Sequence, residues 1–345
     1  MKSFFDEANR LSRMSELGDP LVKLNSVVNW EIFRPELESF FPSCPEKQGR
    51  RPWDAVLMFK IQILQEMYNI SDDRTEYQIN DRLSFQRFLG LELGDNVPDA
   101  KTIWKYRELL VKGDVHRKLF KLFNAMLEEK EIITHKGTIV DATIVERTRQ
   151  RMTKEEREEI KKGEIPKSIS DNAHKLSQKD LEASGTQKHG KKYYGYKNHV
   201  KADEDSKLIL DYRVTGAKTH DSTQIAEMVD ETDRKIKADS AYRGKSIAKA
   251  IKAKNRKVRM DIGCKNEKNR RMTEKQKEHN SRLSRTRCRI EHIFGHMVKA
   301  MGGKLIRVIG LSRAACKIGL KNLAYNMQRY CFLSTSKTAL GQKYA

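Results

Sequence analysis

The segment Lys136–Val145, KGTIVDATIV, places a single carboxylate inside an apolar strand. From Thr138 on, its residues are β-branched except for Asp141 and Ala142, which is typical of a strand. Side chains alternate between the two faces of a strand, so Asp141 lies on the face opposite Val140. An ionised carboxylate in a core strand is costly unless it is paired or binds a metal. A bond to a neighbouring backbone or Lys and a role as metal ligand are both open for Asp141.

The net charge of +22 is confined to the second part of the chain. Residues 1–135 hold 20 Lys and Arg against 22 Asp and Glu, which leaves 49 against 25 for residues 136–345. Such an excess favours a polyanionic partner, and nucleic acid is the expected one, because neutralising phosphates releases condensed counterions. Acidic residues are interspersed throughout, so this part is not a disordered basic tail.

The sequence disfavours a membrane protein, a secreted protein and a protein stabilised by disulfides or zinc. The sequence has no run of 18 apolar residues, and its first residues, MKSFFDEANR, lack the apolar core of a signal peptide. We therefore expect a soluble, cytoplasmic protein without membrane contact. Its five Cys residues are scattered and form no CxxC pair, so neither a disulfide framework nor a zinc site is indicated.

Residues 1–135 are expected to form an all-helical domain. Residues 1–50 are weakly patterned, with a turn near Pro42–Pro45, and apolar spacing and capping residues predict four helices after them: Trp53–Tyr68, Asp72–Leu83 behind an N-cap at Ser71, Asp99–Leu110 and His116–Glu129.

The helix Asp99–Leu110 has a polar face and follows a turn, which is compatible with helix-turn-helix DNA binding. Lys101, Lys105 and Arg107 are its candidate DNA contacts. A purely structural or dimerising role is the alternative for this region.

Residues 136–334 are expected to form a second domain of α/β class, a mixed sheet flanked by helices. The basic, apolar-poor segments 146–190 and 264–282 are expected to be loops or partly helical arms, and the tail 335–345 to be loose. The predicted strands are Thr138–Val145, Tyr193–Ala202, Leu208–Thr215, Lys235–Asp239, Lys257–Ile262 and Leu305–Ile309; the predicted helices are Thr223–Asp233, Gly244–Lys254, Arg285–Met301 and Leu311–Tyr330.

Two further carboxylates accompany Asp141. Asp239 ends the strand KIKAD, where α/β sheets place ligands, although a helix N-cap is an equally good interpretation. Glu291 lies in the helix RTRCRIEHIFGHM, one turn after Arg287, and an ordinary salt bridge between these two is its simpler interpretation. Isolated carboxylates on two strands and a helix of a basic domain suggest phosphoryl transfer with Mg²⁺ ions, which take oxygen ligands and stabilise attacking and leaving oxygens.

Several segments together resemble the DDE transposases of bacterial insertion sequences, specifically the insertion-sequence-five family. In the second domain these are TIVDATIV, QKDLEASGTQKHGKKYYGYKNHVKAD, GAKTHDS, KADSAYRGK, RIEHIFGHM and IRVIGLSRAACKIGLKNLAYNMQR. In the first, RPWDAVLMFKIQILQEMYNISDD and DRLSFQRFLGLELGDNVPDAKTIWKYREL resemble the N-terminal domain of that family. The resemblance covers about residues 50–330, in order.

The resemblance implies an RNase H-like fold in which Asp141, Asp239 and Glu291 hold two Mg²⁺ or Mn²⁺ ions. It implies cleavage of double-stranded DNA at transposon ends, joining of the freed 3′-hydroxyl to target DNA, action as at least a dimer, and a place at the bacterial nucleoid. Tyr242 and Gly244 fit the family's Asp-x-x-Tyr-x-Gly turn.

The family's Tyr–Arg–Glu–Lys signature is matched in part. Arg287 fits its Arg, whereas Ser284 stands at the Tyr position and Val298 at the Lys position, with Lys299 one place late. These departures bear on the residues that contact DNA, for which the candidates are Lys197, Asn198, Arg243, Arg287 and Lys299.

Other polar residues have simpler explanations. Lys197, Asn198 and His199 suit a half-exposed sheet face as well as an active site, and His220 and Asp221 suit a loop cap. His292 and His296 are one turn apart without a third His or Cys nearby, which makes a zinc site unfavourable.

Two other functions are compatible with these observations. One is a DNA-binding regulator without catalysis, which would bind DNA through the N-terminal helices and the basic arm. The other is a nuclease of the same fold that cleaves strands without joining them.

Overall fold

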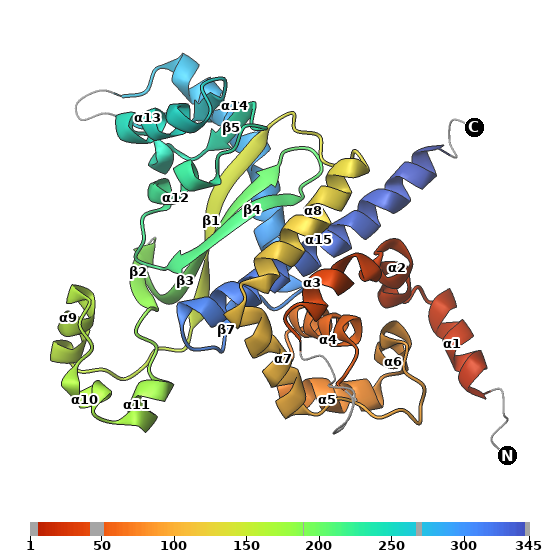
Figure 1. The fold of residues 1–345 in the computed structure, drawn as a ribbon. Coiled ribbons are helices and arrows are strands. Elements are labelled where there is room, and N and C mark those ends of the chain that lie inside the picture. The colour runs from red at the N-terminus through yellow and green to blue at the C-terminus, as the bar shows by residue number, and fades with distance from the viewer. Residues whose placement is uncertain (1–5, 42–51, 189, 267–270, 342–345) are drawn as a thin grey trace. The chain divides into compact units, whose positions relative to one another are not determined.

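The computed structural model describes residues 6–41, 52–188, 190–266 and 271–341 (Figure 1). The chain forms two compact units, one made of Met1–Glu129 with Gly319–Ala345 and the other of Lys130–Ile318. This division differs from the expected one at the C-terminal end, because the last helix leaves the second unit at Gly319. Within the first unit, Asn326 donates to Asn124 Oδ1 over 3.0 Å, and Lys321 Nζ lies 3.4 Å from Glu66 Oε2.

The first unit is all-helical around an aromatic core that includes Phe33, Phe59 and Phe123. Ser71, the predicted N-cap, accepts a bond from the backbone of Arg74, and Asp99 accepts one from the backbone of Thr102. Its elements are α1 (Asp6–Glu16), α2 (Pro20–Val27), η1 (Trp30–Phe33), α3 (Arg34–Glu38), α4 (Ala55–Tyr68), α5 (Asp72–Asp81), α6 (Leu83–Leu89), α7 (Ala100–Lys112) and α8 (Val115–Glu129). The turn expected at Pro42–Pro45 lies outside the described residues.

The second unit is built on a seven-stranded mixed sheet with the order β2-β3-β1-β5-β6, in which β4 also pairs with β3 and β7 with β1. The strand β3 runs antiparallel to its two neighbours, β1 and β4 (Figure 1). On the other side of β1, the strands β5 and β6 run parallel to it. The strands are β1 (Thr138–Arg147), β2 (Ser184–Lys188), β3 (Lys191–Asp203), β4 (Ile209–Gly216), β5 (Lys235–Ala238), β6 (Arg259–Ile262) and β7 (Leu305–Ile306).

Helices cover both faces of this sheet. Val140 packs with Ile225 of α12 (Asp221–Met228) and Ile251 of α13 (Lys245–Lys254), so these helices cover the face of Val140. The opposite face, which carries Asp141, receives α14 (Glu274–Lys299). The alternation in KGTIVDATIV therefore directs Val140 to an apolar core on one face of β1 and Asp141 to the opposite face, where Arg287 of α14 binds it.

One segment is partly helical, as one of its two interpretations predicted, and two others are more ordered than expected. The basic arm 146–190 contains α9 (Lys154–Lys162), α10 (Lys167–Ser170), α11 (Ala173–Gln178) and β2. The long helix α14 begins eleven residues before the predicted Arg285, because Thr273 and Gln276 form a capping box. The last helix, α15 (Leu311–Gly341), continues past the predicted end at Tyr330 into the tail that was expected to be loose.

Among the described residues, no helix is long and apolar enough to span a membrane.

Candidate active site

Asp141 and Asp239 occupy matching positions on neighbouring parallel strands. Val140 of β1 pairs with Ala238 of β5, and the next residue of each chain segment is one of the two aspartates. Neighbouring strands lie about 4.8 Å apart, so their carboxylates reach the same small region. Asp239 also caps the short helix η2 (Ser240–Tyr242) by accepting the Ser240 amide at 2.5 Å, as its alternative interpretation predicted.

Arg287 of α14 joins the two carboxylates. Its Nη2 donates to Asp141 Oδ2 over 3.1 Å, and its Nη1 lies 3.5 Å from Asp239 Oδ1. The helix is held beside the sheet by Arg289, which donates to the Glu204 carbonyl over 2.6 Å, and by Lys237, whose Nζ lies 3.3 Å from Thr286 Oγ1. One guanidinium therefore faces two carboxylates across the β1–β5 pair.

Glu291 lies one turn beyond Arg287 on α14. Four residues advance a helix by about 6 Å and return to nearly the same side, so Glu291 lies on the side that carries Arg287. Its carboxylate is exposed and forms no hydrogen bond or ion pair within the described part of the chain. The i,i+4 salt bridge with Arg287 is not formed, because Arg287 is engaged by the two aspartates.

Burial raises the pKa of Asp141 above its ordinary value. The amide of Ala142 and the guanidinium of Arg287 act in the opposite direction but do not fully offset burial. The Asp141 side chain is 22% exposed against 48% for Asp239, which accounts for its greater desolvation. The charged form of Asp141 therefore calls for more positive charge than Arg287 supplies.

Buried polar atoms adjoin the carboxylates. Tyr242 is 1% exposed and its hydroxyl has no hydrogen-bond partner among the described residues, and neither has Arg287 Nε. Burial, with the nearby charges of Asp141 and Asp221, raises the pKa of Tyr242. Buried polar groups are nearly always satisfied, so these two atoms leave hydrogen-bonding capacity beside the carboxylates for water or a ligand.

A second group of polar side chains lies on β3 and α12. The sequence interpreted its β3 members equally well as part of a half-exposed sheet face. Lys197 Nζ lies 2.8 Å from Asp221 Oδ1 and donates to the Thr219 carbonyl, while His199 Nδ1 lies 3.9 Å from the same carboxylate oxygen. Burial lowers the pKa of His199 to about 4. His220 is the N-cap of α12, as expected for a loop cap. The alternation in YKNHVK was the available signal, since it directs Lys197 and His199 to one face.

Two family models match the chain. Residues 133–327, more than half of the chain, match the model described as "Transposase DDE domain". The chain belongs to the DDE transposase family. Residues 9–109 match a second model, described as "Transposase domain (DUF772)". No solved structure matches the chain.

The family gives the sheet its place among known folds. The transposase has the RNase H-like fold that its DDE domain implies, preceded by a helical N-terminal region, as predicted. Its function is that of a transposase acting on DNA, and the expected membership of the DDE transposases of insertion sequences is confirmed. The matched models name no particular group of insertion sequences.

The candidate DNA contacts of the transposase fall into two groups. Lys101, Lys105, Arg243 and Lys299 are exposed. Arg107 is instead buried and donates to both oxygens of Asp72 over 2.6 and 2.7 Å, so its guanidinium is engaged within the helical unit. Asn198 is also buried, and Lys197 and Arg287 are engaged by carboxylates.

The donor set of the transposase fits a divalent metal in chemistry but is not assembled into a finished site. Carboxylate oxygens are the ligands that Mg²⁺ prefers, and DDE transposases generally use divalent metal ions. Asp141 and Asp239 supply such oxygens around one cation, and the raised pKa of Asp141 favours more positive charge there. Among the described residues, no three Asp, Glu, His or Cys side chains are grouped closely enough to hold an ion.

Proposed function

We propose that this transposase binds the terminal inverted repeats of an insertion sequence, cleaves DNA at the ends of the element and joins the freed 3′-hydroxyl to target DNA. Asp141, Asp239 and Glu291 would be the catalytic carboxylates and would hold two Mg²⁺ or Mn²⁺ ions. The observation that carries the proposal is the shared guanidinium of Arg287, which draws two of these carboxylates together from separate strands.

The metals would stabilise negative charge on the attacking and leaving oxygens of the phosphodiester. The protein's own part is to hold the carboxylates in place. Asp141 and Asp239 are fixed by strand register and by bonds from the amides of Ala142 and Ser240. Glu291 lies one turn beyond Arg287 on nearly the same side of α14, which is the helix that brings Arg287 to the aspartates.

Arg287 has two roles in this proposal. Without metal it offsets the repulsion between Asp141 and Asp239, which would otherwise push the carboxylates apart. With metal and DNA bound, the guanidinium of Arg287 would no longer be needed between the two carboxylates and could pair with a phosphate, for which its planar donors are suited.

Strand cleavage of a labelled duplex carrying the element's own terminal repeat tests the proposal. Asp141→Asn, Asp239→Asn and Glu291→Gln should each lower the rate of cleavage by at least about a thousandfold, equivalent to about 4 kcal/mol in the barrier. DNA binding should remain near the wild-type level. Cleavage at the normal rate by any of the three variants contradicts the assignment.

Pre-cleaved ends separate a transposase from a nuclease of the same fold. Supplied with such ends and a plasmid, a transposase joins them, whereas a nuclease leaves them unjoined. A regulator without catalysis would bind the same DNA in a salt-sensitive manner, need no Mg²⁺ and be indifferent to the three carboxylate variants.

Because an element has two ends, their joint processing calls for at least two copies of the chain, and we expect a homodimer or larger assembly on DNA. Sedimentation of the protein with and without the terminal repeat measures this directly.

A further inference from the structure

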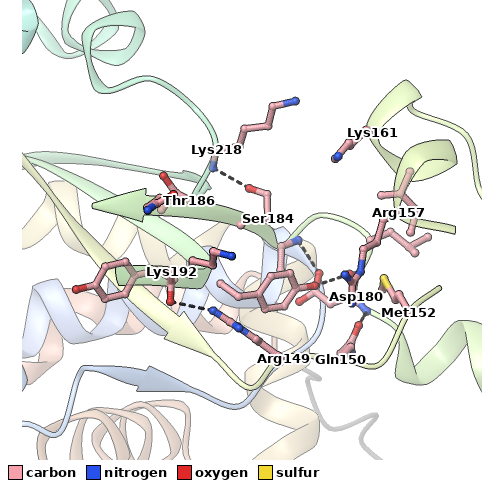
Figure 2. Close-up of a pocket in the computed structure, with 17 residues that line it drawn as sticks. Arg149, Gln150, Met152, Arg157, Lys161, Asp180, Ser184, Thr186, Lys192 and Lys218 are labelled. Atoms are coloured by element: carbon pink, nitrogen blue, oxygen red, sulfur yellow. Dashed lines mark hydrogen bonds between the residues drawn. The ribbon is translucent and has the colours of Figure 1, made fainter. Parts of the chain in front are cut away.

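A cavity of about 650 Å³ lies between α9 of the basic arm and the β2–β3 hairpin, within the second unit. Five cationic side chains line it: Arg149, Arg157, Lys161, Lys192 and Lys218 (Figure 2). Its volume falls within the range of about 300–1,000 Å³ that is usual for pockets of small organic groups. The cavity can therefore admit a group as large as a nucleotide.

Among the described residues that line the cavity, the one acidic side chain is Asp180, and it is already neutralised. Asp180 is buried, its Oδ2 lies 3.0 Å from Arg147 Nε, and it accepts the Tyr196 hydroxyl over 2.6 Å. Neither Arg147 nor Tyr196 lines the cavity. The charge of Asp180 is thus used to tie the returning arm to the end of β1, and it does not offset the five cations.

Three of these cations are placed by regular structure, Arg157 and Lys161 by α9 and Lys192 by β3. Arg157 and Lys161 are one turn apart on α9, so they share one face of that helix, with Ile160 beside them. On the other side, Arg149 donates to the Lys192 carbonyl over 2.9 Å, which closes the arm onto β3. In Figure 2, Lys161 and Arg157 stand on the helix side and Lys192 and Thr186 on the strand side. None of the five has an ion-pair partner among the residues that the structure describes.

The position of the cavity relative to Asp141 follows from strand register. Asp141 is opposite Val200 of β3, whereas the cavity is lined by Lys192 and Tyr194 of the same strand. Six to eight residues of strand span about 20–26 Å. One DNA strand advances about 3.4 Å per nucleotide, so this span corresponds to roughly six to eight nucleotides.

We propose that this cavity binds the phosphodiester backbone of the DNA substrate, about six to eight nucleotides from the bond that is cleaved. Five uncompensated cations around one concavity are suited to phosphates, and the half-buried rings of Tyr193 and Tyr194 offer apolar wall to the sugars. The proposal rests on the proposed function only in taking Asp141 as the place of cleavage.

Neutralising charge on the protein is the first arm of the test. Lys161→Gln and Lys192→Gln remove lining cations, and Lys162→Gln and Lys191→Gln remove exposed cations next to them in sequence that do not line the cavity. Binding of the terminal-repeat duplex to the full chain is measured in EDTA as a function of salt. The double lining variant should lower the slope of log K against log[salt] by about 1.8, and the double control variant by much less. Equal changes in the two would overturn the proposal.

Neutralising charge on the DNA is the second arm. Single methylphosphonates, which lack the phosphate charge, are placed one at a time on either side of the cleavage site. Binding by wild type should weaken most when the neutral linkage is about six to eight nucleotides away, and the double lining variant should lose this position dependence. A profile that is the same for both proteins would overturn the proposal. Neither arm requires cleavage. A negative result in these binding experiments therefore leaves the cleavage test of the carboxylate variants valid, and a negative cleavage test leaves binding at the cavity measurable.

Discussion

The second unit holds two clusters of one cation and two carboxylates, and they differ in how completely they are satisfied. In the first, Lys201 pairs with Asp230 and with Asp233 Oδ2. Thr138 donates to Asp233, and the amide and hydroxyl of Thr232 donate to Asp230. In the second, Arg287 pairs with Asp141 and Asp239, and Arg287 Nε has no hydrogen-bond partner in the described parts of the chain.

The pKa values of Asp230 in the first cluster and Asp141 in the second are shifted in opposite directions. Burial raises the pKa of Asp230, but bonds from Lys201 and Thr232 more than reverse this, and the net pKa is lowered. Burial raises the pKa of Asp141, and here Ala142 and Arg287 do not reverse it. The same formal charges thus form a closed structural cluster in one place and an under-compensated site in the other. This difference, rather than the presence of buried carboxylates, distinguishes the candidate active site.

The largest effect on stability is expected from removing the cation of the closed cluster, which consists of Lys201, Asp230 and Asp233. Lys201→Met keeps the length of the side chain but leaves Asp233, which is 3% exposed, without its cation. Breaking a buried pair in this way should lower the free energy of unfolding by about 3–5 kcal/mol. Urea unfolding measures it. Cleavage per folded molecule should be unchanged, and a loss of activity beyond the loss of folded protein would show that the two clusters are coupled.

The sequence predicted the elements of this site but not its central contact. The alternation in KGTIVDATIV was enough to set Asp141 apart from the apolar face of β1, and the end of KIKAD placed Asp239 beyond a strand. Arg287 suggested a local partner, Glu291, yet it binds Asp141 across 146 positions. Local spacing cannot reveal a partner fixed by how α14 packs on the sheet.

The same limit explains Arg107 and the cavity. Arg107 looked like an exposed residue of a polar helix face, but its partner Asp72 lies 35 positions earlier, at the start of α5. The arm 146–190 was apolar-poor and suggested a loop or a partly helical arm. Its cavity exists because Asp180 returns to Arg147, and nothing in the spacing of the two residues predicts that pair.

Metal should stabilise the open cluster and leave the closed one unaffected. At Mg²⁺ or Mn²⁺ concentrations about a hundred times Kd, wild type should gain about 2.7 kcal/mol in the free energy of unfolding. Asp141→Asn should lose most of this gain, and Asp230→Asn should keep it. Unfolding followed with added metal and then with excess EDTA measures the difference. An equal gain in all three proteins would place the binding of metal elsewhere.

A smaller effect of opposite sign is expected from neutralising one carboxylate in each cluster without metal. Asp141→Asn removes a charge whose burial is under-compensated, since burial raises the pKa of Asp141, so it should raise the free energy of unfolding. Asp233→Asn removes a carboxylate that Lys201 needs and should destabilise the fold. Thermal unfolding at neutral pH compares them, and destabilisation by both substitutions would remove the distinction between the clusters.

The smallest effect is the pH dependence of the stability that Asp141→Asn gains over wild type without metal. The sign of this pH dependence follows from the raised pKa of Asp141. Because the folded state holds the Asp141 proton more tightly than the unfolded chain does, this group lowers stability as the pH rises from about 3.8, the unfolded value, through the folded pKa. The advantage of Asp141→Asn over wild type should therefore be full above the folded pKa and shrink as the pH falls toward 3.8. For Asp230, whose pKa is lowered, the contribution to stability is present above 3.8 and is lost only in more acidic solution. Urea unfolding of wild type and Asp141→Asn between neutral pH and pH 4 measures the shrinkage; a pH-independent advantage would mean that charge at Asp141 is not its cause.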